Sequence, residues 1–113
     1  MWIISTVGFF SVVQKQGQAG LTIRSRVLAD LERLREQYLP TLGKIIDFGG
    51  TDYPFRAVAS RAAVAAAVGK IAKDVRYDNF KKAIAEAQGP DRHNVYGEVW
   101  RVLLRLQTIK TQP

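Results

Sequence analysis

The sequence contains no cysteine and a single histidine, His93. Without cysteine the chain cannot form a disulfide, use a thiolate nucleophile or build a cysteine-based zinc site. With one histidine it cannot place a multi-histidine metal site within one copy. We therefore predict no metal site and no cofactor. His93 lies near the start of a predicted helix, where capping or surface exposure is a commoner role than general base catalysis.

Short catalytic motifs are also missing. The chain has no HExxH, P-loop or GxSxG pattern, and its glycines fit no phosphate-binding loop. Asp47 and Asp52 flank a Gly-Gly turn and could form a carboxylate pair, but aspartates at such positions usually shape the turn. We assign no catalytic residue. An enzyme whose site has no short signature stays an alternative.

Long apolar runs are absent as well. The opening MWIISTVGFF has no basic start and continues into SVVQKQ without a small-residue cleavage site, so it does not resemble a signal peptide. No run approaches the roughly 18 to 20 apolar residues that a membrane span needs. We expect a soluble cytoplasmic protein with no membrane partner.

The 113 residues do carry a balanced apolar content of 47% and a net charge of +7. This length and composition predict one globular domain over residues 1–113. Residues 1–29 hold three basic side chains and no acid, residues 30–74 hold seven and six, and residues 75–113 hold seven and four. The basic excess lies towards both ends of the chain. A charge of this sign favours nucleic acid or an acidic protein as partner, although a solubilising surface explains it too.

The first 75 residues show two hairpin-and-helix patterns. WIIST and FFSVVQ form one kinked strand or two short ones around Gly8, and KQGQAG connects them to the strand LTIRSR. Apolar residues at helical spacing between Val27 and Leu39 predict a helix that ends before Pro40. KIIDF and FRAVAS, separated by GGTDYP, predict a second hairpin, and apolar residues from Val64 to Val75 predict a second helix.

Two further helices are predicted after Arg76. Asp78 can cap the first, Gly89-Pro90 ends it, and Asp91 can cap the second. The fold class is therefore α+β, with an antiparallel sheet of about four strands and helices packed on it. The order is hairpin-helix-hairpin-helix in a ferredoxin-like two-layer arrangement, followed by the C-terminal helix pair. The three segments are residues 1–40, 43–75 and 78–107.

Basic residues near aromatic rings make nucleic acid a plausible partner. On the first predicted hairpin Arg24 and Arg26 lie close to Phe9 and Phe10, a combination that suits phosphate neutralisation and base stacking on a single strand. The full set of nucleic-acid-binding candidates is Lys15, Arg24, Arg26, Arg56, Arg61, Lys81 and Lys82. In the stretch RYDNFKK an ordinary helix start, with Asp78 as cap and Phe80 packed inward, is the favoured interpretation.

The stretch GFFSVVQK, residues 8–15, invites comparison with the strand motif of the RNA-recognition-motif domain. It matches at Gly8, Phe9 and Val12, but two aromatic platform positions are missing and the strand order differs, so that family is rejected. Large apolar groups alternate onto both faces of this strand. We predict that it is covered on both faces, the second cover coming from residues 79–107 or from another copy of the chain.

Several aromatic and polar residues are candidates for contacts with a partner. These interaction candidates are Phe9, Phe10, Tyr53, Tyr77, Asn79 and Trp100.

Six stretches resemble those of a family of short, uncharacterised bacterial proteins. MWIIST, GFFSVVQK, RSRV, DYPFR, YDNFK and VWRVLLRLQ occur in the same order over nearly the whole chain. The resemblance implies a stand-alone, single-domain bacterial protein. It transfers no activity and no functional residue.

Three functions follow as hypotheses. The first is a small, non-enzymatic, homo-oligomeric binding protein whose basic surface contacts nucleic acid. The second is a protein-interaction or homodimerisation module with no nucleic-acid role. The third is an undetected enzyme or small-ligand binder, which would need a pocket lined by convergent polar groups.

Overall fold

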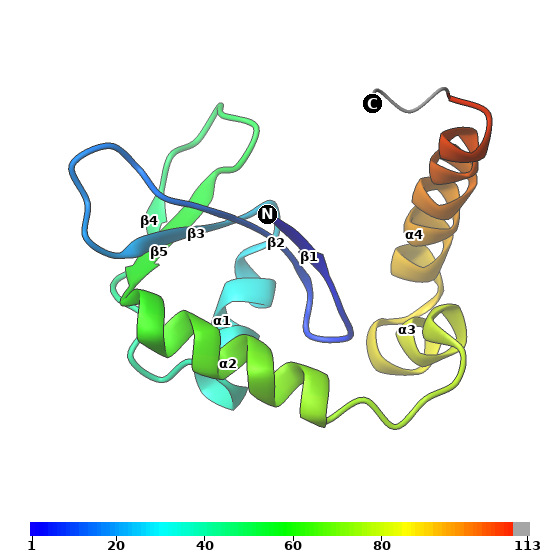
Figure 1. Cartoon of the computed structure of the whole chain (residues 1–113), viewed down its shortest axis with the longest axis horizontal. Coiled ribbons are helices and arrows are strands. Elements are labelled where there is room, and N and C mark those ends of the chain that lie inside the picture. Colours follow the sequence, from blue (N-terminus) through cyan, green and yellow to red (C-terminus); the bar gives the residue numbers. More distant parts are fainter. Residues whose placement is uncertain (110–113) are drawn as a thin grey trace. The chain divides into compact units, whose positions relative to one another are not determined.

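The computed structural model describes residues 1–109 and divides them into two compact units, the first Met1–Val75 and the second beginning at Arg76. The first contains the sheet and two helices, and the second contains the C-terminal helices (Figure 1). Each unit is described by itself below. Whether they behave as one domain, as the sequence predicts, stays a prediction.

The first unit is built on a five-stranded antiparallel sheet with the order β1-β2-β3-β5-β4. The strands are β1 Trp2–Ile4, β2 Phe9–Val13, β3 Leu21–Ser25, β4 Ile46–Asp47 and β5 Phe55–Ala59. The predicted α+β class with an antiparallel sheet is confirmed. A fifth strand appears because the N-terminal segment forms two short strands. The predicted KIIDF strand is shorter, since only Ile46 and Asp47 pair with β5.

The turn between β1 and β2 is fixed by a buried carboxylate. Gly8 has a φ of 158°, and a Cβ atom added there would lie 2.5 Å from Cγ of Asp30. Asp30 is buried at the start of the first helix, where its Oδ2 accepts a hydrogen bond of 3.0 Å from the backbone N–H of Phe9. Arg33 lies 3.2 Å from the other carboxylate oxygen and also donates to the carbonyl of Val7. This contact positions β2 against the helix.

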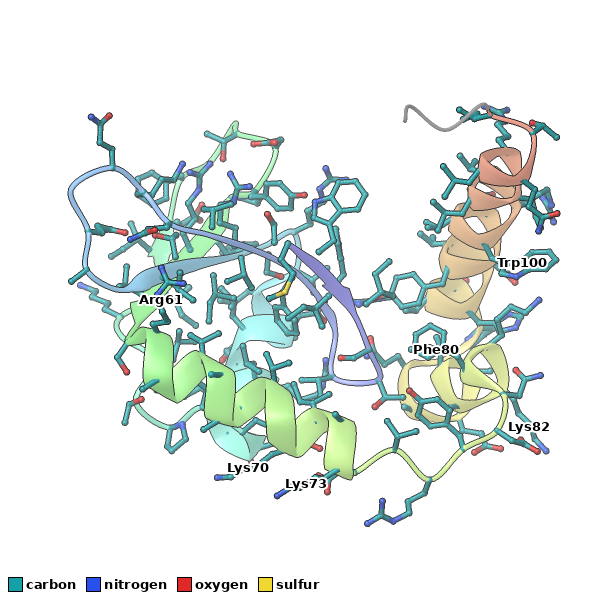
Figure 2. All side chains as sticks on the ribbon, viewed as in Figure 1. Arg61, Lys70, Lys73, Phe80, Lys82 and Trp100 are labelled. Atoms are coloured by element: carbon teal, nitrogen blue, oxygen red, sulfur yellow. The ribbon has the colours of Figure 1, made fainter. Side chains whose placement is uncertain are left out.

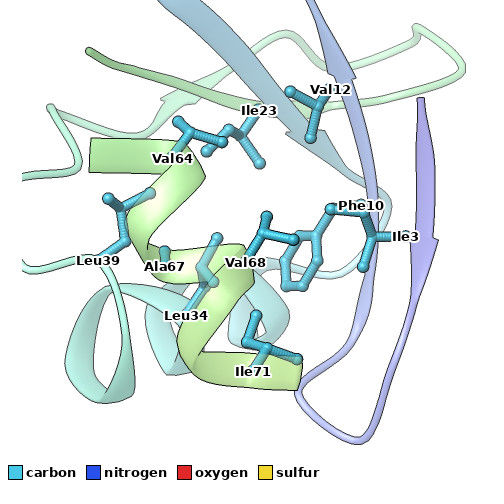
Figure 3. Close-up of a pocket in the computed structure, with 10 residues that line it drawn as sticks. All are labelled: Ile3, Phe10, Val12, Ile23, Leu34, Leu39, Val64, Ala67, Val68 and Ile71. Atoms are coloured by element: carbon cyan, nitrogen blue, oxygen red, sulfur yellow. The ribbon is translucent and has the colours of Figure 1, made fainter. Parts of the chain in front are cut away.

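Two helices cover one face of the sheet, α1 Leu28–Gln37 and α2 Arg61–Lys73. Ser60 caps α2 by accepting a 3.1 Å hydrogen bond from the backbone N–H of Ala63. The apolar side chains of alternate strand residues point towards the helices, as Figure 3 shows for Phe10, Val12 and Ile23. The void among them is about 10 Å³, about the space of one water molecule. This layer is the packed core.

The second unit contains α3 Phe80–Gln88 and α4 Pro90–Leu103, followed by the 3₁₀ turn η1 Leu104–Gln107. The predicted helix pair and its break at Gly89-Pro90 are present. The predicted cap is wrong, because Asn79 and not Asp78 accepts the hydrogen bond from the backbone N–H of Lys82. Asp91 lies within the first turn of α4, whose N-cap is Gly89. Among residues 1–109, no helix combines the length and apolar content that crossing a bilayer requires.

Candidate functional site

The sheet face opposite α1 and α2, called the open face from here on, carries arginines and aromatic rings. One row of directly paired residues crosses it with a single side chain from each strand. In strand order this row is Trp2, Ser11, Arg24, Arg56 and Ile46. At about 4.8 Å between strands, the row is about 19 Å long. This length accommodates an extended ligand.

Arg24 and Arg56 are direct partners across the β3–β5 pair. Like charges placed opposite each other on neighbouring strands destabilise a sheet, so this pair carries an electrostatic cost. The carboxylate of Asp52 lies 3.9 Å from Nη2 of Arg56 but is largely exposed, which makes it a weak counter-charge. The charge of the pair is therefore only partly balanced within the first unit.

Arg24 is held in one orientation by two contacts. Its Nη2 donates a 2.7 Å hydrogen bond to the hydroxyl of the buried Ser11, and its guanidinium lies 4.5 Å from the ring centroid of Tyr53. Its Nε is buried and has no hydrogen-bond acceptor among the described residues. A buried donor without an acceptor is costly, and an anionic oxygen or a water molecule would relieve that cost. The Arg24 side chain is thus fixed in orientation, but one of its hydrogen-bond donors, Nε, has no acceptor among the described residues.

Arg26 and Arg56 bind the loop between β4 and β5. Nε of Arg26 donates to the carbonyl of Asp52 at 3.1 Å, and Nε of Arg56 donates to the carbonyl of Tyr53 at 3.0 Å. The guanidinium of Arg26 also lies 4.9 Å from the Tyr53 ring centroid. Tyr53 is only 3% exposed. The ring of Tyr53 therefore supports the arginines and is not itself a free platform.

Two other aromatic side chains on this side are accessible. Trp2 is 68% exposed and meets Phe9 edge-on, with ring centroids 5.7 Å apart. Phe48 is exposed and lies 5.2 Å from the Arg56 guanidinium. Neither was a sequence candidate. The face on which Trp2 lies depends on how β1 pairs with β2. The sequence does not give that pairing unless the two strands are known to form a hairpin that turns at Gly8.

A shallow groove of about 260 Å³ extends the open face towards β4. Its basic lining residues are Lys15, Lys44 and Arg56, and Ile46, Phe48 and Val58 give it an apolar floor. Its remaining lining residues are Gln18, Thr22, Gly43 and Ala57. Because none of these described lining residues is acidic, the groove favours an anionic group combined with a flat or apolar one.

The predicted nucleic-acid-binding residues fall into two groups. The first group lies on or beside the open face: Arg24 and Arg56 belong to the row across it. Lys15 lines the groove, and Arg26 contacts the loop between β4 and β5. The others lie elsewhere: Arg61 begins α2, and Lys81 and Lys82 belong to α3 in the second unit (Figure 2). Lys44 was missed, because a lone lysine in a loop has no distinguishing sequence pattern.

The predicted interaction residues are also divided. Phe9 lies half-buried on the open face, whereas Phe10 is 1% exposed in the core and cannot contact a partner. That assignment is corrected, because adjacent residues of a strand face opposite sides. In the second unit Tyr77 contacts Phe80, with ring centroids 6.0 Å apart, and Asn79 caps α3. Trp100 stays exposed on α4 (Figure 2), and Nζ of Lys81 lies 4.2 Å from its ring centroid.

The second face of β2 is covered by side chains of its own unit. Arg24 contacts the Ser11 hydroxyl, and Phe9 lies between Trp2 and Tyr53, whose ring centroid is 6.2 Å from that of Phe9. The expectation of a strand covered on both faces thus has a local explanation. Cover by residues 79–107 or by another copy stays a prediction.

Among residues 1–109, no group of three or more histidine, aspartate or glutamate side chains is placed to hold a metal ion. Comparison with known proteins found no family model, no curated protein and no solved structure that matches this chain. The resemblance to short bacterial proteins therefore stays a prediction, and function rests on the geometry of the open face.

Proposed function

We propose that this chain is a non-enzymatic binding protein whose open face holds single-stranded nucleic acid. The observation that carries the proposal is the direct pairing of Arg24 with Arg56, two like charges whose counter-charge, the largely exposed Asp52, lies 3.9 Å from Arg56 and is weak. A phosphate between them would turn this repulsion into attraction and could supply the acceptor that Nε of Arg24 lacks. Lys15, Arg26 and Lys44 add positive charge around the pair.

The accessible flat groups favour a single strand over a duplex. Bases of a single strand can stack on aromatic rings and on guanidinium planes, whereas those of a duplex are already stacked and paired. Trp2 and Phe48 are exposed, and the guanidiniums of Arg24 and Arg26 lie over the Tyr53 ring. The face therefore offers phosphate contacts and stacking surfaces side by side.

Fluorescence anisotropy with a labelled single-stranded oligonucleotide tests the proposal. At about 50 mM salt, where phosphate contacts are strongest, we expect binding that weakens steeply as salt is added. The variant Arg24→Ala with Arg56→Ala should bind at least about tenfold more weakly, since each charged hydrogen bond contributes about 1.5–3 kcal/mol. An equimolar unlabelled duplex should compete less well than the unlabelled single strand.

The matched control is Lys70→Ala with Lys73→Ala. It removes the same charge from α2, where Figure 2 shows both side chains directed away from the sheet. Its affinity should stay within about twofold of the unaltered chain, because exposed charges at a distance act only through a screened field. Equal losses in the two variants, or no binding of the unaltered chain at low salt, would overturn the proposal.

An enzyme or binder of a small ligand is the alternative that the groove allows, and the oligonucleotide assay tests whether the ligand is small. If the groove takes one nucleotide or another small phosphate compound, a mononucleotide should displace the labelled oligonucleotide at a similar concentration. If the whole row across the sheet binds, affinity should rise with oligonucleotide length until the row of about 19 Å is filled. We expect the length dependence.

A further inference from the structure

The row of paired residues that crosses the open face is unevenly charged. At the β1 end, Trp2 and Ser11 carry no charge, and the arginine pair follows on β3 and β5. Beyond that pair lies the groove towards β4, where Lys15 and Lys44 add two more positive charges. A single strand that follows the row therefore meets the highest density of positive charge at the β4 end.

Lys44 follows a segment that is tied both to the sheet and to α1. The backbone N–H of Gly43 donates a 2.9 Å hydrogen bond to the carbonyl of Val58 in β5. Arg35 of α1 donates from Nε to the carbonyl of Leu42 at 3.3 Å, and from Nη2 to the carbonyl of Gly43. Because these contacts fix the backbone immediately before Lys44, its side chain reaches the groove from a defined point beside β5.

Lys15 lies in the connection between β2 and β3, which is also held by hydrogen bonds. The backbone N–H of Gln18 donates to the carbonyl of Lys15 at 3.1 Å. The hydroxyl of Thr22, a buried residue of β3, donates to Oε1 of Gln18 at 2.8 Å. Lys15 and Lys44 thus come from two separately anchored loops and line the same groove.

The groove carries more positive charge than one internal phosphate neutralises. Its basic lining residues are Lys15, Lys44 and Arg56, and only Arg56 has the exposed Asp52 as a weak counter-charge. An internal phosphodiester carries one negative charge. A phosphomonoester carries about −1.5 to −2 at pH 7, because its second pKa is about 6. Two lysine ammonium groups, which bind phosphate as point charges, match the monoester better.

We propose that the groove binds a terminal phosphomonoester of the single strand, with the terminal base on the apolar floor of Ile46, Phe48 and Val58. This inference rests on the function proposed above and deepens it by naming a phosphorylated strand end as the preferred ligand. The groove volume of about 260 Å³ is below the range of about 300–1,000 Å³ that is typical of ligand pockets, which suits one terminal nucleotide and not a longer segment. The rest of the strand then runs over the arginine pair towards Trp2.

Three oligonucleotides of one sequence, labelled at the same internal base, test the inference by fluorescence anisotropy. One carries a 5′-phosphate, one a 3′-phosphate, and one has hydroxyl groups at both ends. At about 50 mM salt and neutral pH, at least one phosphorylated strand should bind about threefold or more tightly than the hydroxyl-ended strand. The two phosphorylated strands show which end occupies the groove.

Lowering the pH tests whether charge causes this gain. At about pH 5 the monoester carries close to one negative charge, so the gain from the terminal phosphate should shrink. The charged side chains around the groove, Lys15, Lys44, Arg56 and Asp52, act on all three strands. The ratio of affinities at each pH therefore reports the charge of the strand end. An equal gain at both pH values would overturn the inference.

The variant Lys15→Gln with Lys44→Gln separates the groove from the arginine pair. It should bind the hydroxyl-ended strand within about threefold of the unaltered chain, since the arginine pair is intact, but the gain from a terminal phosphate should disappear. Lys70→Gln with Lys73→Gln is the matched control, because it removes the same charge from α2 and should keep the gain. Circular dichroism confirms that both variants stay folded.

The possible results separate this inference from the proposed function. If the hydroxyl-ended strand binds and neither terminal phosphate adds affinity, the inference is overturned and the proposed function stands. The same holds if the gain persists in the variant that lacks both groove lysines. If no strand binds at low salt, both are overturned together.

Discussion

The two faces of the sheet are made by alternate residues of the same strands, yet they differ in composition. Towards α1 and α2, Phe10, Val12 and Ile23 are buried in an apolar layer. On the other side the same strands present Ser11 and Arg24, and β5 adds Arg56 opposite Arg24. The first face gains stability from burial, whereas the second accepts like-charge repulsion and an unsatisfied donor. A strand with a period of two can therefore present one face that stabilises the fold and another face that does not.

The adjacent phenylalanines of β2 provide the sharpest test of this difference. Phe10→Ala should lower the free energy of unfolding by about 3–5 kcal/mol, because it leaves a cavity beneath the helices. Phe9→Ala should cost about 1 kcal/mol, since that ring is only half-buried. Urea denaturation followed by circular dichroism measures both values. Equal losses would show that the open face is a second core.

The contact between Gly8 and Asp30 sets which residues of β2 face the helices. Gly8→Ala should lower the free energy of unfolding by about 1–3 kcal/mol, because the new methyl group meets the Asp30 carboxylate. Gly69→Ala is the matched control. Gly69 lies on α2, and a Cβ atom added there would meet nothing within 4 Å. It should raise stability by about 0.5–1 kcal/mol through helix propensity. Thermal denaturation of the two variants checks that Gly8→Ala lowers the stability and that Gly69→Ala raises it.

Removing one charge of the arginine pair should leave stability nearly unchanged. Arg24→Gln keeps an amide donor near Ser11 and removes the repulsion from Arg56, so the two effects oppose each other. We expect a change of less than about 1 kcal/mol, more favourable at low salt than at high salt. A loss of several kcal/mol in urea denaturation would mean that the pair serves folding.

The smallest expected effect lies at the end of α1, where the hydroxyl of Tyr38 donates to the carboxylate of Asp74 at 2.6 Å. That hydrogen bond, with burial and the negative charge of Asp74, raises the pKa of Tyr38 above its usual value of 10.0. The folded state therefore favours the protonated phenol, and this contribution is present below pH 10 and is lost as pH rises through the raised pKa. Tyr38→Phe should lose less stability than the unaltered chain as the pH rises above about 10. An identical alkaline decline in both would contradict this origin.

Sequence patterning predicted the elements that depend on local periodicity. The alternation in LTIRSR placed Ile23 and Arg24 on opposite faces, and apolar spacing located both helices of the first unit. It did not settle the N-terminal hairpin, because the role of Gly8 depends on Asp30, more than twenty residues away. Nor did it reveal that Arg24 and Arg56 are partners, since the register of β3 with β5 is a long-range property.

Chemical-shift mapping of the amide groups tests the central role of the open face most directly. An isotope-labelled sample is titrated with a single-stranded oligonucleotide at low salt. The largest shifts should occur at Ser11, Arg24 and Arg56 and at the indole N–H of Trp2, with little change along α2. Shifts concentrated on α2, or on Lys81 and Lys82 of α3, would contradict the assignment of binding to this face.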